Sequence, residues 1–392
     1  MSTPSAQSPG SAGSADTSAD TSSTRDEFID LCRAFSLLVV VLWHWVFTIV
    51  VWHSRGPSAD SPLSFTDNLW ILTWVLQVMP VFFFVGGYAH LQLWSKLRGS
   101  GASFVLGRMR RLLVPSLALL AVWAAIAAVA EGVFRVHWFG RAALLIVSPL
   151  WFVAVYLALV LLAPLAIRLH QRFGPLVVVV LAGLAALVDV LRFGQHVAWA
   201  ALINLIVVWA LCHQLGFFYR TLADGDRILA WCFVWGGLFA LVGLVLTNIY
   251  PPSMVGVPGD RISNMGPPTL CIVALCFFQT GLVLLVRPWV LERLRRPGWA
   301  QVNDVVNRFA LPLFLFHTTG YAIAFTLLWL TGYRPPSHPT LAWWAQRPIW
   351  LVVPLVCTIP VILVFGRRIG GARRPVAVPA PQPVAVTGES RW

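Results

Sequence analysis

The stretch RDEFIDLCRAFSLLVVVLWHWVFTIVVW, residues 25–52, decides the fold and carries the polar groups around which the chain is organised. After Asp30 it offers about twenty residues that are almost all apolar, enough for a helix to cross a bilayer. His44 follows Arg33 by eleven positions, so both project from one helix face, about 16 Å apart along the axis. Asp30 lies one turn before Arg33 on roughly the same side. The stretch therefore predicts a membrane-spanning helix with a polar stripe that faces a bundle interior or a wet cavity.

Two interpretations of this stripe are open from the residues alone. Asp30 and Arg33 can be interfacial anchors whose charged ends reach water, and His44 can be a hydrogen-bonding group between helices. Alternatively, the three side chains belong to one functional site. Their alignment on one face favours the site, because ionisable groups are costly inside a membrane.

The composition indicates a polytopic membrane protein. Of the 392 residues, 58% are hydrophobic and 11% are charged, and the mean hydropathy is +0.77. A soluble domain could not bury so much apolar surface. The net charge of +13 comes from basic residues that fall between apolar runs, so we predict no nucleic-acid partner. The six cysteines show neither metal-ligand nor disulfide spacing, and we predict no metal site and no tightly bound cofactor.

We predict an all-α transmembrane bundle of about ten spans within residues 25–366. The predicted spans are 31–52, 68–93, 112–131, 149–168, 175–192, 197–219, 228–248, 268–286, 309–331 and 347–366. The flanks, residues 1–24 and the Arg- and Pro-rich residues 367–392, lack apolar cores and are expected to be disordered.

The basic residues indicate how the bundle is oriented. Of the 28 Lys and Arg residues, 21 fall in the segments on the side of the N-terminus and seven on the other side. Those seven are Arg55, Arg135, Arg141, Arg192, Arg261, Arg334 and Arg347. Because cytoplasmic loops carry an excess of basic residues, both termini are predicted to be cytoplasmic.

Three further spans contain features that bear on a site. In the second span, Pro80 and the pair Gly86-Gly87 predict a kink and close helix packing. The sixth span contains His213, and the ninth contains His317. Counting from residue 309, we expect His317 about 12 Å from the cytoplasmic side.

A basic group, Arg108 to Arg111, precedes the third span. It can be ordinary cytoplasmic-loop charge, or a patch that binds phosphate, for which arginine is well suited. The residues alone leave both interpretations open.

The sequence contains no hydrolase elbow, phosphate loop, dinucleotide fingerprint or HExxH zinc pattern. What remains is His44 inside a membrane, on a polar stripe that begins at a basic cytoplasmic mouth. A histidine can take a proton from an attacking hydroxyl or amine and return it to the leaving group. A basic mouth favours a phosphate-bearing donor, and acyl-CoA fits in both charge and length. These features predict acyl transfer.

Four motifs resemble the acyltransferase-3 family of integral membrane O- and N-acyltransferases. The family's first helix has an Arg, then Leu-Asp-x-x-Arg, then an apolar run ending in His; here Arg25, Ile29-Asp30-Leu31-Cys32-Arg33 and Val39 to His44 are similar. The Phe-Phe-x-x-Ser-Gly-Phe motif resembles Phe83 to Tyr88. The basic pair before the third helix matches Arg108 and Arg111, and the late Tyr-Leu-x-His resembles Phe314-Leu315-Phe316-His317. The resemblance covers about residues 25–366.

This resemblance implies a cytoplasmic acyl-CoA donor and an acceptor on the outer side, usually a glycan or lipid-linked sugar of the cell envelope. It implies that His44 is the catalytic base, that Arg33 holds donor or base, and that Arg108 and Arg111 contact the coenzyme. We place Asp30 with His44 and Arg33 as candidate catalytic residues. The candidate substrate-binding residues are Arg25, Arg108, Arg111, Tyr156, His213 and His317.

The chain departs from the family pattern at two positions. A Glu that often ends the family's Trp-x-Leu-x-Val-Glu in the fourth span is replaced by Tyr156, and the motif Ser of the second span is Gly86. If that Glu helps bind acceptor or carry protons, either Tyr156 substitutes for it or the acceptor differs.

We therefore predict a multi-pass acyltransferase of the bacterial inner (plasma) membrane. It would move an acetyl or other short acyl group from acyl-CoA to a hydroxyl, as in O-acetylation, or to an amine of a glycan, lipid-linked or small-molecule acceptor. The main alternative is a proton-coupled transporter of a small anion, since a helix bundle with buried histidines and a basic mouth suits both. A scaffold without a site is a third possibility.

Overall fold

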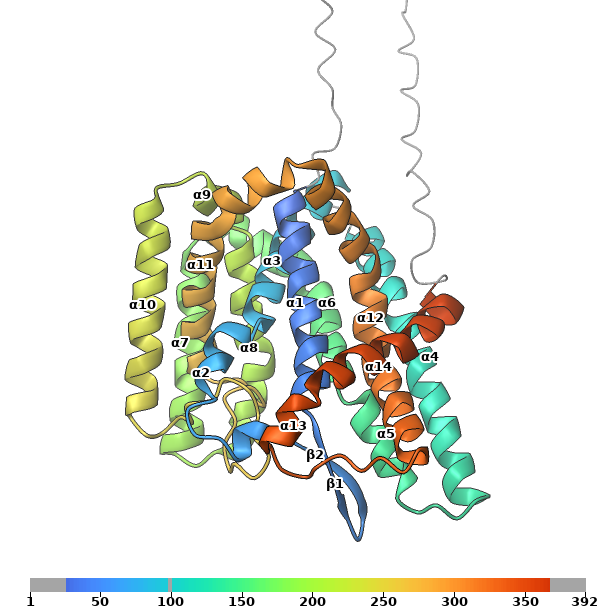
Figure 1. The fold of residues 1–392 in the computed structure, drawn as a ribbon. Coiled ribbons are helices and arrows are strands. Elements are labelled where there is room, and N and C mark those ends of the chain that lie inside the picture. The colour runs from blue at the N-terminus through green and yellow to red at the C-terminus, as the bar shows by residue number, and fades with distance from the viewer. Residues whose placement is uncertain (1–25, 98–100, 367–392) are drawn as a thin grey trace, which may run out of the picture.

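The computed structural model describes residues 26–97 and 101–366, and these form a bundle of mostly upright helices (Figure 1). Ten helical segments of this part are long and apolar enough to cross a membrane, as the sequence predicted. The elements are α1 (Glu27–Phe47), β1 (Ile49–His53), β2 (Gly56–Asp60), η1 (Pro62–Ser64), α2 (Ile71–Leu76), α3 (Met79–Lys96), α4 (Gly101–Gly132), α5 (Phe139–Val147), α6 (Leu150–Phe173), α7 (Leu176–Asp189), η2 (Val190–Gly194), η3 (Ala198–Ala200), α8 (Ala201–Gly216), α9 (Tyr219–Ala223), α10 (Arg227–Leu246), α11 (Leu270–Leu294), α12 (Pro297–Leu330), α13 (Leu341–Ala345), α14 (Arg347–Val361) and η4 (Ile362–Gly366). Arg25 and the flanks predicted to be disordered lie outside the described residues.

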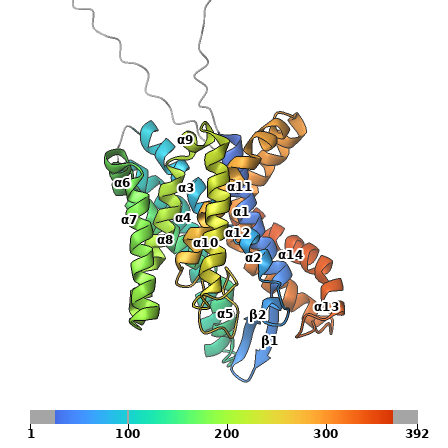
Figure 2. The same ribbon diagram turned by 90° about the vertical axis from the view of Figure 1, so that its left-hand side faces the viewer.

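The bundle has two ends, which we name by their elements. α1 begins at one end, the N-terminal face, and runs toward the other end, the hairpin face, from which β1 and β2 project (Figure 1). α1 packs against α3, α12 and α14. α14 lies obliquely against α12 and α1, on the opposite side of the bundle from α7 (Figure 2). The polar stripe of α1 is only partly buried, with the Arg33 side chain 38% exposed and that of Asp30 13% exposed.

The first span starts four residues earlier and ends five residues earlier than the predicted 31–52. α1 starts at Glu27, after Asp26 accepts a hydrogen bond from the Ile29 backbone amide at 3.1 Å as its N-cap. It ends at Phe47, and Ile49–His53 pairs as an antiparallel strand with Gly56–Asp60. β-Branched residues favour a strand here, and Gly56 has a φ of 112°, which lets the hairpin turn.

The second span is interrupted between α2 and α3, where Pro80 stands in the first turn of α3. Gln279 of α11 donates to the carbonyls of Gln77 at 2.9 Å and Trp74 at 3.1 Å, and the Gln77 side chain accepts from the Met79 amide at 3.1 Å. Backbone groups freed by the interruption are thus bonded within the protein, as a membrane requires. The predicted kink is a full helix break.

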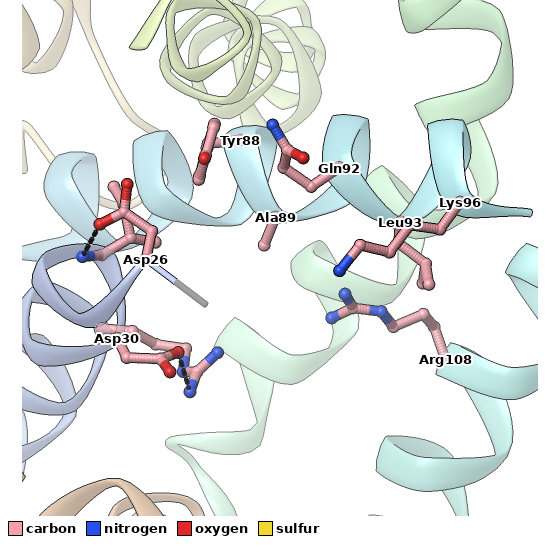
Figure 3. A pocket seen from close by; sticks show the side chains of 10 residues that line it. Asp26, Asp30, Tyr88, Ala89, Gln92, Leu93, Lys96 and Arg108 are labelled. Carbon is pink, nitrogen blue, oxygen red and sulfur yellow. Dashed lines mark hydrogen bonds and ion pairs between the residues drawn. The ribbon is translucent and has the colours of Figure 1, made fainter. Parts of the chain in front are cut away.

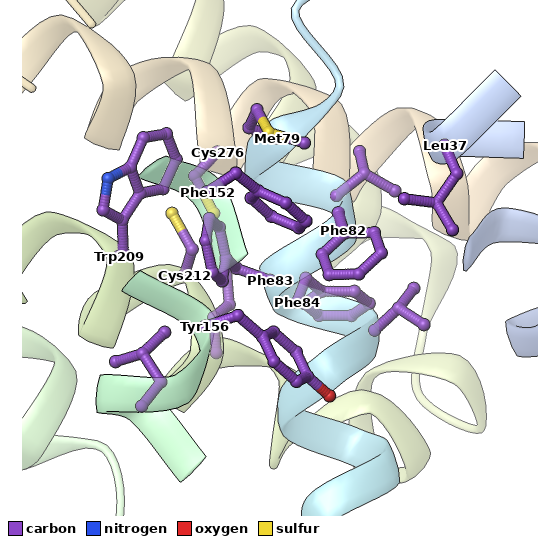
Figure 4. Packing of buried hydrophobic residues seen from close by; sticks show 14 of the residues in the cluster. Leu37, Met79, Phe82, Phe83, Phe84, Phe152, Tyr156, Trp209, Cys212 and Cys276 are labelled. Atoms are coloured by element: carbon purple, nitrogen blue, oxygen red, sulfur yellow. The ribbon is translucent and has the colours of Figure 1, made fainter. Parts of the chain in front are cut away.

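Gly87 and Gly216 let α3 and α8 touch backbone to backbone, which is the close packing predicted for this span, while Gly86 faces the ring of Tyr156 on α6. A side chain on Gly87 would overlap the His213 carbonyl, and one on Gly216 would overlap the Phe84 carbonyl. Beside this contact the core is aromatic: Figure 4 shows a cluster that includes Phe82, Phe83, Phe84, Phe152, Tyr156 and Trp209. This contact fixes the relative register of α3 and α8.

Further segments differ from the predicted layout. The third span, predicted as 112–131, is α4, which begins at Gly101, so Arg108 and Arg111 lie within this helix and not in a loop before it. α11 continues to Leu294, past the predicted end at 286. Residues 139–147, expected in an outer loop, form α5, which packs on α4 and β2. The ninth span, expected to begin at 309, is the 34-residue helix α12 that begins at Pro297. Its first turns carry Asn303, Asp304 and Asn307, whose polarity lowers the hydropathy that marked the span. The longer α12 changes the depth of every residue counted along it.

Candidate functional site

The polar stripe of α1 begins with an ion pair at the N-terminal face. Arg33 Nη2 lies 2.8 Å from Asp30 Oδ1 and donates to Asn307 Oδ1 at 3.0 Å. Asn307 Nδ2 in turn donates to Asn303 Oδ1 at 2.8 Å, and Asn303 Nδ2 donates to the Glu27 carbonyl at 3.2 Å. The guanidinium of Arg33 is therefore held between α1 and α12.

Sequence reasoning missed both asparagines because they fell in a segment predicted to be a loop. Their spacing of four residues would have placed them on one helix face, which was the signal that could have found them.

A cavity of about 230 Å³ opens beside this ion pair. It is lined by Asp26, Ile29, Asp30, Arg33, Tyr88, Ala89, Gln92, Leu93, Lys96 and Arg108. Figure 3 shows the amine of Lys96 and the guanidinium of Arg108 directed toward each other across one side of it. Like charges that converge in this way repel each other unless an anion lies between them. The cavity is thus suited to a negatively charged group.

A further arginine lies behind the cavity wall. Arg220 Nε donates to the Tyr88 hydroxyl at 2.8 Å, and this hydrogen bond raises the pKa of Arg220. Next to it in the chain, Tyr219 accepts from Arg287 Nε at 2.9 Å, and burial raises the pKa of Tyr219. These two hydrogen bonds place the guanidinium groups of Arg220 and Arg287 at this face.

Behind Arg108, a chain of hydrogen bonds passes through four helices. Arg108 Nη1 donates to the Tyr156 hydroxyl at 3.5 Å, and that hydroxyl lies 3.0 Å from His90 Nε2. His90 Nδ1 lies 2.8 Å from His213 Nε2. Arg108 is on α4, Tyr156 on α6, His90 on α3 and His213 on α8. The chain joins three predicted residues through a histidine that was not predicted.

His90 could have been found from the sequence, because it is an ionisable residue inside a predicted span and follows Gly87 by three residues. Its partner could not, because nothing in the sequence states that α3 packs on α8.

The second histidine pair joins α1 to α12. His317 Nε2 lies 3.3 Å from His44 Nδ1, and His44 Nδ1 lies 2.8 Å from the Val40 carbonyl. The expectation that His317 lies about 12 Å from the N-terminal side was wrong. His44 is 17 residues into α1 and His317 is 20 residues into α12, so the two reach similar depths. The count from residue 309 omitted the first three turns of α12.

The carbonyl partners settle which nitrogens carry protons in the neutral rings. A carbonyl only accepts, so His44 Nδ1 carries a proton toward Val40, and His317 Nδ1 carries one toward the Phe314 carbonyl at 2.5 Å. The single His44 Nδ1 proton is then shared between the Val40 carbonyl at 2.8 Å and His317 Nε2 at 3.3 Å. His44 Nε2 is left with a lone pair, and the described residues place no hydrogen-bond partner on it. This nitrogen can act as a base.

Aromatic rings fill the space between the two histidine pairs. Phe152 lies 6.4 Å from the Tyr156 ring centroid and 5.3 Å from that of Phe314, which lies 5.7 Å from the His317 ring. The side chains between the cavity and His44 are therefore aromatic and apolar.

The predicted residues therefore form two groups. Asp30, Arg33 and Arg108 line the cavity, with Tyr156 and His213 behind it, whereas His44 and His317 form a pair nearer the hairpin face. Arg111 is exposed and does not line the cavity, and Arg25 lies outside the described residues. Within the ranges 26–97 and 101–366, no three His, Cys, Asp or Glu side chains are grouped to hold a metal ion.

Comparison with known proteins gives one match. No curated protein and no solved structure matches the chain. A family model described as an acyltransferase domain, acyltransferase-3, matches residues 26–367, nearly the whole chain. This match decides between the two main predictions, enzyme and transporter. The chain belongs to the acyltransferase-3 family and is a multi-pass membrane acyltransferase that transfers groups other than amino-acyl groups.

Proposed function

We propose that the protein transfers a short acyl group from acyl-CoA at the N-terminal face to a hydroxyl or amine acceptor that arrives from the hairpin face, with His44 as general base. The observation that carries this proposal is the hydrogen bonding of His44, which leaves its Nε2 unprotonated inside the bundle. His44 stands three residues before the end of α1, close to the hairpin face.

The basic cavity supports acyl-CoA as the donor. Its lining contains Arg33, Lys96 and Arg108 against the carboxylates of Asp26 and Asp30. Arg33 forms an ion pair with Asp30, whereas no carboxylate of the described residues forms an ion pair with Lys96 or Arg108. Phosphate groups of a coenzyme would supply the missing negative charge. The N-terminal face, with both termini, is then cytoplasmic, in the inner (plasma) membrane of a bacterium.

The reaction follows from the position of His44 Nε2. It takes the proton of the acceptor hydroxyl or amine, whose oxygen or nitrogen attacks the thioester carbonyl carbon. The tetrahedral intermediate collapses, the carbon–sulfur bond breaks, and the imidazolium returns the proton to the thiolate. The products are an acyl ester or amide and free CoA. His317 accepts the Nδ1 proton throughout and stabilises the positive charge on His44.

The acceptor is proposed by class. The family resemblance and the outer position of His44 favour a glycan, lipid-linked sugar or small molecule of the cell envelope, and acetyl as the group transferred. Asp30 and Asn307 hold Arg33 for the donor, and Arg25 and Arg111 stay candidate contacts for the coenzyme.

The proposal is tested with the purified protein in vesicles whose N-terminal face points outward. The vesicles enclose an envelope extract and receive acetyl-CoA radiolabelled in the acetyl group. We expect release of free CoA thiol and appearance of label in an enclosed glycan or lipid, with neither in protein-free vesicles. Intact acetyl-CoA in the presence of folded protein contradicts the proposal.

Replacing His317 by leucine is expected to lower kcat about 10- to 100-fold. The change removes one of the two acceptors of the His44 Nδ1 proton and leaves the Val40 carbonyl as the other. A hydrogen bond to a charged group contributes about 1.5–3 kcal/mol. His317→Gln retains a side-chain oxygen that can accept, so it should keep most of the rate. Steady-state rates of thiol release measure both variants, and equal losses would contradict the assigned role.

A further inference from the structure

Given the acyl-CoA donor proposed above, on which this step rests, we propose that Tyr156 and His90 are positioning residues. They hold the guanidinium of Arg108 in the cavity without neutralising its charge, so that it meets the phosphate groups of the donor.

The first step concerns the partners of the two cavity arginines. Arg33 lies against the carboxylate of Asp30 at 2.8 Å, which balances its charge. Arg108, among the described residues, is held by the Tyr156 hydroxyl at 3.5 Å and has no carboxylate partner. A hydroxyl orients a guanidinium but leaves its charge in place. The lining thus holds three basic side chains, Arg33, Lys96 and Arg108, against two carboxylates, Asp26 and Asp30, and among the described residues no carboxylate forms an ion pair with Arg108.

The second step concerns the rigidity of Tyr156. Its ring is 8% exposed and packs edge-on against Phe82 at 5.7 Å, and Figure 4 shows its hydroxyl directed away from Trp209 and Cys212. A Cβ on Gly86 would lie 3.3 Å from Cε2 of the Tyr156 ring. The ring thus occupies space that the missing side chain of residue 86 leaves open. The two departures from the family pattern, Gly86 and Tyr156, are in contact with each other.

The third step concerns the far side of the hydroxyl. His90 is fully buried, with Nε2 3.0 Å from Tyr156 and Nδ1 2.8 Å from His213 Nε2. A hydroxyl and a neutral imidazole can each donate one hydrogen bond and accept another. The Tyr156 hydroxyl can therefore accept from Arg108 and donate to His90 Nε2, while His90 Nδ1 donates to His213 Nε2. His213 is held in place by the contact of its carbonyl with Gly87. Through Tyr156 and His90, the position of the Arg108 guanidinium therefore depends on the rigid contact between α3 and α8.

The test compares two acetyl donors on the same protein. Acetyl-CoA has the phosphates that Arg108 would meet, and S-acetyl-N-acetylcysteamine has the thioester without them. We expect Tyr156→Phe to raise the KM for acetyl-CoA about 3- to 10-fold, the effect of one lost hydrogen bond. The KM for S-acetyl-N-acetylcysteamine should rise less. The ratio of kcat/KM for acetyl-CoA to kcat/KM for S-acetyl-N-acetylcysteamine should therefore fall.

Two further variants sharpen the comparison. Arg108→Ala should reduce the preference about 10- to 100-fold, since it removes a charged contact, and Tyr156→Phe added to it should reduce the preference no further. Tyr250→Phe is the matched control: Tyr250 is buried and donates to Asp189 at 3.0 Å, outside the cavity lining, so its loss should leave the donor preference unchanged.

Equal losses with both donors in Tyr156→Phe, or no change with either, would overturn the positioning role while the proposed function stands. A wild-type protein that consumes no acetyl-CoA would instead overturn the proposed function and this role with it.

Discussion

Replacing His44 by alanine is expected to slow acyl transfer by about two to four orders of magnitude, the usual contribution of a positioned general base. The variant lacks the Nε2 lone pair that takes the acceptor proton, while the cavity residues Arg33 and Arg108 are untouched. We therefore expect kcat to fall and the apparent affinity for acetyl-CoA to change little. Release of CoA thiol, followed with time, measures the rate.

The control for this prediction is His53→Ala. His53 is an exposed histidine on β1 that is hydrogen-bonded to Ser58 at 2.9 Å, so its loss removes an imidazole at the same end of the bundle. It should retain the rate of the wild type. A His44→Ala protein that elutes as folded, monodisperse material and still transfers acetyl at the normal rate would refute the assignment of the base.

Replacing Gly87 by valine is expected to prevent normal packing of the bundle. The added Cβ would overlap the backbone carbonyl of His213, and a backbone atom cannot rotate away as a side chain can. α3 and α8 would have to separate. We expect this to cost about 3 kcal/mol or more, the upper end of the range typical of overpacking. We expect a large fall in the yield of monodisperse protein in detergent and in its apparent Tm.

Gly183→Val provides the matched control, because Gly183 lies within α7 and a Cβ there meets no atom within 4 Å. Valine also has a higher helix propensity than glycine. Similar melting temperatures for the two variants would show that the close α3–α8 contact does not limit stability.

The number of spans and the stripe of α1 were predictable because both depend on local regularities. Hydropathy over about twenty residues marks a span, and the rise per residue places Arg33 and His44 on one face. The same rule gave a wrong depth for His317, because the start of α12 was hidden by Asn303 and Asn307. Asn303 is buried and Asn307 is half-buried, because both form hydrogen bonds with α1. A hydropathy profile contains no information about such contacts between helices.

The hydrogen-bond chain behind Arg108 was less predictable. Tyr156 and His213 were candidates, but their connection through His90 depends on which helices are neighbours. In a nearly all-apolar helix such as α3, the sequence does not mark one face as the contact surface. Gly87 and Gly216 made a close approach possible, and the tertiary structure determined that they face each other.

Under the proposed function, the distance between the basic cavity and His44 sets the length that an acyl donor needs. Arg33 and His44 are fixed on one rigid helix, eleven positions and about 16 Å apart. An acyl phosphate carries its reactive carbonyl directly beside its charge, so it cannot occupy the cavity and present that carbon to His44 at once. A donor with a long flexible arm can do both, and the bundle would therefore select its donor by reach before any contact with the acyl group itself.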